Sequence, residues 1–339
     1  MRNHFKELSR EYPERKSGSV AAAKVAQAIT AQAAALNLKT VTEKIKVFHF
    51  QKSILAFCLG SLAAFLIGLY LPLPGLILET ALWLLLLGEV KRPVLAGIKT
   101  ETAENLVVAI PARSKETQKV VLTAAYDTSL FLSAPLGLNP YWYWGLSLSL
   151  GLVIPILQSA GFMLAFDTLK FWSLVPLILL AVFSILPGKT AFSSGLNGCI
   201  ALLETASILL RFRPSITTVI LYFTGGSSLN SGVQKLPALF KGENPTYGLN
   251  LVEQNRPEIG IINREGFLPQ SGSLLLKELL IEVAADKSIP VKSIITSEVT
   301  PSYPLLSQKA NAISLAVPAE ETNENLRELL VGFIRKIEH

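Results

Sequence analysis

The chain has 339 residues and a formal net charge of +6; 50% of its residues are hydrophobic and only 17% are charged. A typical globular domain has about 25% charged residues, so part of this chain is unusually apolar. The basic residues form no stripe interleaved with aromatics, which argues against nucleic-acid binding, and the two cysteines lack the spacing of a disulfide framework or a zinc knuckle.

The first fifty residues are polar at the start and then helical in pattern. The opening segment, MRNHFKELSREYPERK, is charged and has no early apolar stretch, so no signal peptide is expected. Val20–Leu36 is rich in alanine with apolar residues at helical spacing, which predicts a helix capped by Ser17 or Ser19.

A first apolar block follows, from Ser53 to about Val90. Ser53–Leu71 is uncharged, and a helix of its length would span about 28 Å, close to the hydrocarbon thickness of a bilayer. Pro72 and Pro74 end this run, and Leu76–Leu87, which contains Glu79, continues it. The pattern predicts a transmembrane hairpin over 53–90.

A second apolar block covers 141–187. It begins with the aromatic cluster Tyr141–Trp144, which is typical of a membrane interface, and Asp167 and Lys170 mark a turn within it. Lys and Arg concentrate on the long flanks of both blocks. The two apolar blocks, each expected to form a hairpin, predict an integral membrane protein with four transmembrane helices and the lipid bilayer as a partner. The positive-inside rule predicts that the soluble domain lies in the cytoplasm.

The remaining sequence alternates strand and helix patterns. Strands are predicted at 105–110, 119–125, 217–223, 259–262 and 312–316, and helices at 197–210, 273–286 and 323–337. The polar stretch Arg113–Gln118 predicts that the first two strands form a hairpin. The alternation indicates an α/β sandwich with a largely parallel sheet.

Six segments, in order, carry a resemblance to a known family. They are Pro13–Ser19 (PERKSGS), Asn105–Pro111 (NLVVAIP), Val120–Asp127 (VVLTAAYD), Asn197–Glu204 (NGCIALLE), Val219–Thr224, and Ser302–Leu315 (SYPLLSQKANAISL). Together they resemble the zinc-dependent aminopeptidases with two co-catalytic metal ions, whose relatives include glutaminyl cyclases, the transferrin-receptor ectodomain and nicastrin. The resemblance implies an aminopeptidase-like three-layer sandwich with a mostly parallel mixed sheet. It would be built from 1–52, 91–140 and 188–339 and interrupted by the hairpins at 53–90 and 141–187.

The resemblance also implies a site, and this sequence departs from it. In the family, five side chains hold two zinc ions and a glutamate acts as general base. The residues standing at those positions here are Ala125 (first His), Ser194 (bridging Asp), Gly226 (general-base Glu), Ser227 (ligand Glu), Asn263 (second Asp) and Ser302 (last His). Asp127, which in the family orients the first histidine, is retained. We therefore expect a lost metal site, no cofactor and no catalytic residue.

A fold kept without its metal ligands favours a role other than catalysis. The sequence predicts a non-catalytic, aminopeptidase-like membrane protein that serves as a binding or scaffold subunit, with a protein partner and with the old cleft as a docking pocket. A membrane-bound peptidase or hydrolase with altered chemistry is an alternative, although no histidine stands where it would activate Ser193 or Ser194. A transporter component is a second alternative, for which Glu79 is the one acidic residue in the apolar helices.

Overall fold

A computed structural model describes the chain over residues 1–47, 50–91, 101–128, 175, 178, 196–225, 232–233, 235–254, 256–266, 269–296, 300, 302–318 and 324–338. The chain divides into two compact units. The first unit comprises Met1–Val47, Lys99–Ser129 and Phe192–His339, and the second comprises Phe48–Ile98 and Leu130–Ala191.

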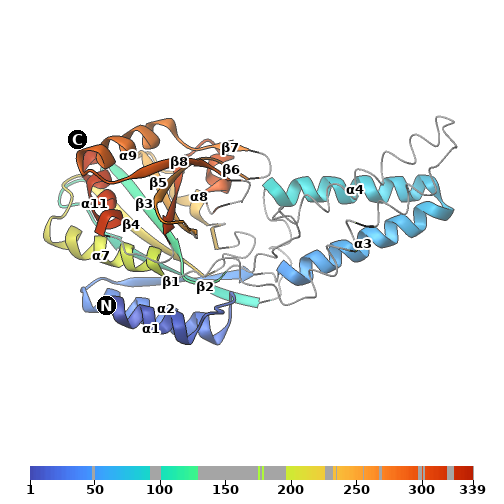
Figure 1. The fold of residues 1–339 in the computed structure, drawn as a ribbon, viewed down its shortest axis with the longest axis horizontal. Coiled ribbons are helices and arrows are strands. Elements are labelled where there is room, and N and C mark those ends of the chain that lie inside the picture. The colour runs from blue at the N-terminus through green and yellow to red at the C-terminus, as the bar shows by residue number, and fades with distance from the viewer. Residues whose placement is uncertain are drawn as a thin grey trace. The chain divides into compact units, whose positions relative to one another are not determined.

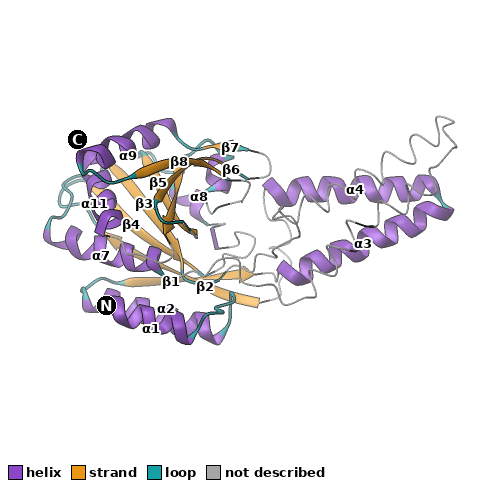
Figure 2. Ribbon diagram, viewed as in Figure 1, coloured by secondary structure: helices purple, strands orange, loops and turns teal. Residues whose placement is uncertain are grey.

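The first unit is built on a mixed β-sheet (Figures 1 and 2). Its described strands are β1 (Thr40–Val47), β2 (Glu101–Ile110), β3 (Gln118–Ala125), β4 (Thr217–Thr224), β5 (Thr246–Gln254), β6 (Ile259–Glu265), β7 (Gln270–Ser271), β8 (Val291–Ile295) and β9 (Asn311–Pro318). Their order is β1-β2-β4-β3-β5-β9-β6-β7, with β8 also paired to β6. The central strands β4, β3, β5 and β9 are parallel, while β2 and β6 flank them in antiparallel pairing. The predicted α/β class with a mixed sheet is confirmed.

Helices cover both faces of this sheet. On one face lie α1 (Arg2–Glu11), α2 (Val20–Ala35), α7 (Asn197–Arg211), α9 (Leu274–Asp286) and α11 (Glu324–Glu338). The other face carries the short helices α8 (Leu236–Leu239) and α10 (Tyr303–Leu306). Because successive strand residues point to opposite faces, Leu122 belongs to the core under the long helices and Val121 to the smaller core under α8 and α10. The result is the expected three-layer arrangement.

The helix predicted at 20–36 shows why local patterns succeed here. Val25, Ile29 and Ala33 recur at every fourth position and are fully buried, so this helix presents one apolar stripe to the sheet. The Ala22 amide donates to Ser19 Oγ over 3.2 Å. Of the two predicted caps, Ser19 is therefore the one that satisfies a free amide of the first turn.

The predicted hairpin between β2 and β3 is wrong, because β4 lies between these two strands. The stretch that joins them bonds instead to the residues that lead into β4: the Arg113 amide donates to Pro214 O over 2.9 Å, and the Thr117 amide to Ile216 O over 3.0 Å. β4 is apolar along both faces and gains two hydrogen-bonded neighbours by this insertion. A partner so far away in sequence leaves no local signal.

In the second unit, α3 (Phe50–Tyr70) and α4 (Pro72–Lys91) lie side by side, with only Leu71 between them (Figure 1). Their backbones approach closely at Gly68 and Gly75. A Cβ added at Gly75 would stand 2.3 Å from Gly68 Cα, so only glycine fits there.

The predicted membrane topology is corrected by these helices. In the part of the chain that the structure describes, no helix combines the length and the apolar composition that a membrane crossing requires. Lys52 lies near the start of α3, and Glu79 interrupts the apolar sequence of α4. The prediction of an integral membrane protein with four transmembrane helices and a cytoplasmic soluble domain is therefore wrong. The second predicted hairpin, 141–187, lies outside the described residues except at 175 and 178.

Candidate functional site

The candidate site is the edge of the sheet where the parallel strands β4, β3, β5 and β9 end. Ala125 pairs with Thr224, and Ala124 pairs with Leu251, one residue before Val252. Ligands of open α/β sheets bind beyond the carboxyl ends of such strands, because the connections leave a crevice there. We call this edge, together with the start of α7, the strand-end site.

Asp127 follows β3 and is buried against the N-terminal segment. It accepts a hydrogen bond from Ser17 Oγ. Arg15 joins the same two segments: its amide donates to Thr128 Oγ1 over 2.9 Å, and its Nε donates to Tyr126 O over 3.1 Å. Burial lowers the pKa of the Arg15 guanidinium, and the charge of Glu253 opposes that shift. Asp127 and Arg15 therefore bind the N-terminal segment to the end of β3.

The first turn of α7 contacts the ends of β3, β5 and β9. The Gly198 amide donates to Glu253 Oε1 over 3.1 Å, so a carboxylate at the end of β5 caps this helix and complements its dipole. Asn197 Nδ2 donates to Pro318 O over 3.2 Å, and Cys199 Sγ donates to Ala125 O over 3.4 Å. Burial raises the pKa of the Cys199 thiol, which keeps it in the protonated, unreactive form.

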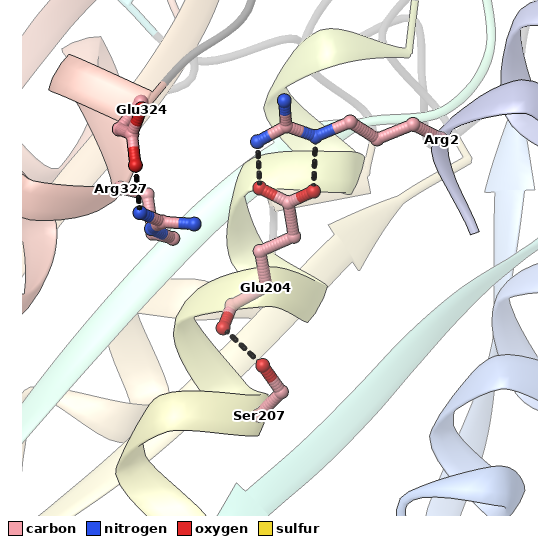
Figure 3. Close-up of polar contacts among 5 residues, drawn as sticks. All are labelled: Arg2, Glu204, Ser207, Glu324 and Arg327. Atoms are coloured by element: carbon pink, nitrogen blue, oxygen red, sulfur yellow. Dashed lines mark hydrogen bonds and ion pairs between the residues drawn. The ribbon is translucent and has the colours of Figure 1, made fainter.

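α7 is also fixed at its middle by the N-terminal helix (Figure 3). Arg2 Nη2 donates to Glu204 Oε2 over 2.7 Å, and Arg2 Nε donates to the other carboxylate oxygen. Such a bidentate ion pair holds both side chains in one orientation, and the hydrogen bond to Glu204 raises the pKa of Arg2. The helix whose first turn forms the site is thus attached to the sheet at one end and to α1 at its centre.

A row of buried polar side chains crosses the sheet on the face that carries α8 and α10. Tyr222, Thr123, Asn250 and Ser314 are in register across β4, β3, β5 and β9. Asn105 of β2 extends this polar row, because its Nδ2 donates to Tyr222 Oη over 2.8 Å.

Asn105 also holds both ends of the segment that follows β4. Its Nδ2 donates to Gly232 O over 2.7 Å, and its Oδ1 accepts from the Gly225 amide over 3.2 Å. One buried amide side chain therefore joins the two residues between which this connection runs, Gly225 and Gly232.

The structure brings together only some of the residues predicted from the sequence. Ala125 and Asp127 lie at the strand-end site, and Ala125 is partly exposed there. Ser302, at the start of α10, is buried and accepts from Ser314 Oγ over 2.9 Å. Ser194, Gly226 and Ser227 lie outside the described residues.

Asn263 is separated from the strand ends. Ala316 of β9 is in register with Val252 near the end of β5. Asn263 follows Ile262, which pairs with Ser314, so it lies further from the strand ends than Ala316. Its Nδ2 donates to Ser293 Oγ of β8, on the far side of β6.

Glu253, Arg15 and Ser17 were missed by the sequence analysis as site residues. An acidic residue at the end of the apolar run GLNLVE was the one local signal for Glu253. Arg15 and Ser17 lie in Pro13–Ser19, the first segment of the resemblance, but the burial of Arg15 depends on contacts with residues 126–128, which the sequence does not reveal.

The two zinc ions implied by the resemblance do not fit these residues. Zinc requires imidazole, thiolate or carboxylate ligands; Ala125 and Thr224, the last residues of β3 and β4, offer none, and the end of β5 offers only Glu253. The nearby carboxylates are used by Ser17 and by the α7 amide. Within the described ranges, no three His, Cys, Asp or Glu side chains come together as metal ligands.

Comparison with known proteins shows the fold. No protein-family model matches the chain, and no curated protein matches it by sequence. Among solved structures, it resembles the glutaminyl cyclase of Fimbriiglobus ruber (TM-score 0.55, 12% identity, 99% of this chain and 93% of that one). It also resembles the Bacteroides thetaiotaomicron glutaminyl cyclase bound to N-acetylhistamine (TM-score 0.54, 8% identity, 99% of this chain and 95% of that one). A third similar structure is a Zn-dependent exopeptidase from Parabacteroides distasonis (TM-score 0.53, 10% identity, 99% of this chain and 96% of that one). The predicted aminopeptidase-like fold is confirmed.

Proposed function

We propose that this chain is a non-catalytic, aminopeptidase-like protein that acts as a binding or scaffold subunit for a protein partner. The observation that supports this role is that both carboxylates at the strand-end site, Asp127 and Glu253, accept hydrogen bonds from other segments of the fold. Asp127 accepts from Ser17, and Glu253 caps α7 beside Arg15. A carboxylate that must take up a proton or hold a metal has to present its lone pairs to the substrate side. Here both serve to join segments of the fold.

The class of ligand is taken from the structural neighbours. They are named as exopeptidases and glutaminyl cyclases, so we expect the strand-end site to take a peptide or protein segment. Ala125 is a small, partly exposed residue at the centre of this edge and offers a surface on which such a segment could rest. Binding there would use main-chain hydrogen bonds and shape, without chemistry.

Metal content and activity test the non-catalytic half of the proposal. The protein is purified without chelators and assayed by elemental analysis, with aminopeptidase and glutaminyl cyclase substrates in parallel. The Parabacteroides distasonis exopeptidase, prepared identically, is the positive control. We expect no stoichiometric zinc and no turnover. About one or two zinc ions per chain, lost on chelation together with activity, would refute the proposal.

A pair of matched variants tests the binding half. A125R places a long charged side chain at the strand-end site, whereas E278R changes an exposed residue of α9. Partners that co-purify with the wild-type protein should be lost with A125R and kept with E278R, while both variants retain the wild-type circular dichroism. Partners retained equally by both would show that the strand-end site is not the docking surface.

A further inference from the structure

Glu265, the last residue of β6, is a buried carboxyl group without a cation beside it among the described residues. Its side chain is 1% exposed. β7 and β9, which pack next to it, contain no titratable residue. Lys292 of β8 forms an ion pair with Glu258, and α10 contributes only the Tyr303 phenol. Arg264 precedes it but pairs with Ser271, and successive strand residues point to opposite faces. An ionised carboxylate in this place would lack a counter-charge.

Glu265 begins a chain of short contacts that connects three separate segments. Its Oε2 lies 2.7 Å from Thr300 Oγ1. Thr300 Oγ1 lies 2.7 Å from Ser314 Oγ in β9, and Ser314 Oγ lies 2.9 Å from Ser302 Oγ at the start of α10. The geometry of the last contact makes Ser314 the donor.

The number of protons available in this series of contacts decides whether Glu265 is protonated or ionised. If the carboxylate is ionised, Thr300 must donate to it and Ser314 donates to Ser302, so both hydroxyl protons are used. The 2.7 Å contact between Thr300 and Ser314 then has no proton, and two oxygen atoms would face each other without a hydrogen bond.

A proton on Glu265 removes this conflict. Glu265 then donates to Thr300, Thr300 donates to Ser314, and Ser314 donates to Ser302. The remaining acceptor positions of these two central hydroxyls are also filled, because the Ser302 amide donates to Thr300 Oγ1 over 3.2 Å and Asn250 Nδ2 donates to Ser314 Oγ over 3.4 Å. Among the described residues Glu265 Oε1 has no hydrogen-bond partner, which costs a neutral carboxyl group less than an ionised one. Each of the two central hydroxyls accepts two bonds and donates one, which is its full capacity.

We propose that Glu265 is protonated in the native fold and acts as a pH-sensitive latch that holds Thr300, Ser302 and α10 against β6 and β9. Burial raises the pKa of Glu265 from its usual 4.5 to about 7. The latch thus contributes fully below about pH 4.5 and is lost as the pH rises through about 7. α10 responds because Leu305 and Leu306 form part of the smaller core, which depends on this segment staying in place. This inference is independent of the proposed function.

Hydrogen exchange on the wild-type protein and on E265Q tests the latch. The amide of E265Q is neutral at every pH and donates an N–H to Thr300, so it mimics the closed state. Between pH 5 and 8, the protection of the amides of Ser302, Tyr303, Leu305 and Leu306 should fall on the order of a hundredfold in the wild type and stay constant in E265Q. The exposed-site variant E278Q should behave as the wild type. Parallel curves for the wild type and E265Q would overturn the proposal.

A carboxyl titration decides the matter even if E265Q does not fold. Carbon-13 NMR of glutamate-labelled protein is recorded in an E79Q background, because burial raises the pKa of Glu79 in α4 to about 7 as well. One remaining glutamate titrating near pH 7 is the expected result. All glutamates titrating near 4.5 would refute a protonated Glu265.

Discussion

Replacing Asn105 by alanine should destabilise the first unit more than any other single amide truncation on the polar row. The substitution removes two donated bonds, to Tyr222 Oη and Gly232 O, and one accepted bond, from the Gly225 amide. A buried hydrogen bond contributes about 1 kcal/mol net, and a buried group left without a partner costs about 1–3 kcal/mol. We therefore expect a loss of about 3 kcal/mol in the free energy of unfolding, a large part of the 5–15 kcal/mol that is usual for a domain.

The assay has to report on the sheet itself. All four tryptophans belong to the second unit, so their fluorescence would follow the wrong part of the chain. Native-state hydrogen exchange of the peptides that contain β2 and β4 measures the opening free energy where Asn105 acts. Denaturation by urea, followed by far-ultraviolet circular dichroism, gives an independent value.

Asn244 provides the matched control for this experiment. It is also an asparagine, but it is only partly buried, and its Nδ2 makes long bonds of 3.3 and 3.4 Å to Glu116. Asn244→Ala should lower the free energy of unfolding by less than about 1 kcal/mol. A loss below about 1 kcal/mol for Asn105→Ala, or equal losses for both variants, would refute the assignment of Asn105 as the residue that fixes this connection.

Three further results are expected. In a double-mutant cycle, Arg2→Ala and Glu204→Ala should show a coupling free energy of about 0.5–1 kcal/mol, since the pair is partly exposed. Zero coupling would mean that the apolar packing of Phe5 and Leu8 holds α1 without a contribution from the ion pair. Gly75→Ala should lower the melting temperature reported by tryptophan fluorescence of the second unit, because its Cβ would meet the Gly68 backbone, and a rise in that temperature would show that the helices do not approach there. Glu253→Gln keeps an acceptor for α7 but loses the charge, and should cost about 1 kcal/mol in urea denaturation, an effect that 1 M salt reduces.

Local patterns in the sequence were enough to identify most long elements of the first unit. The helices predicted at 20–36 and 197–210 and the strands predicted at 119–125 and 217–223 agree with α2, α7, β3 and β4 within about two residues. The reason is that periodicity and caps act over a few residues. Ser19, for example, caps a helix whose buried stripe begins three residues later.

The errors and omissions concern contacts between distant segments. The order of the strands was one such error, because β4 pairs with β2 and β3 from about 100 residues away. The apolar composition of α3 and α4 was over-interpreted as a membrane signal, although no described helix meets the requirements of a span. β5, which carries Glu253, was not predicted as a strand.

For the candidate site, too, the sequence determined some features and the tertiary structure determined others. The sequence by itself determined that Ala125 replaces a ligand of the resembled family and that Asp127 is retained, since both follow directly from the pattern VVLTAAYD. Only the tertiary structure decided that Glu253 caps α7, that Arg15 is buried beside it, and that Asn263 stands away from the strand ends. A side chain's role depends on which partners satisfy its charge and hydrogen bonds, and these partners are set by the pairing and packing of segments far apart in the chain.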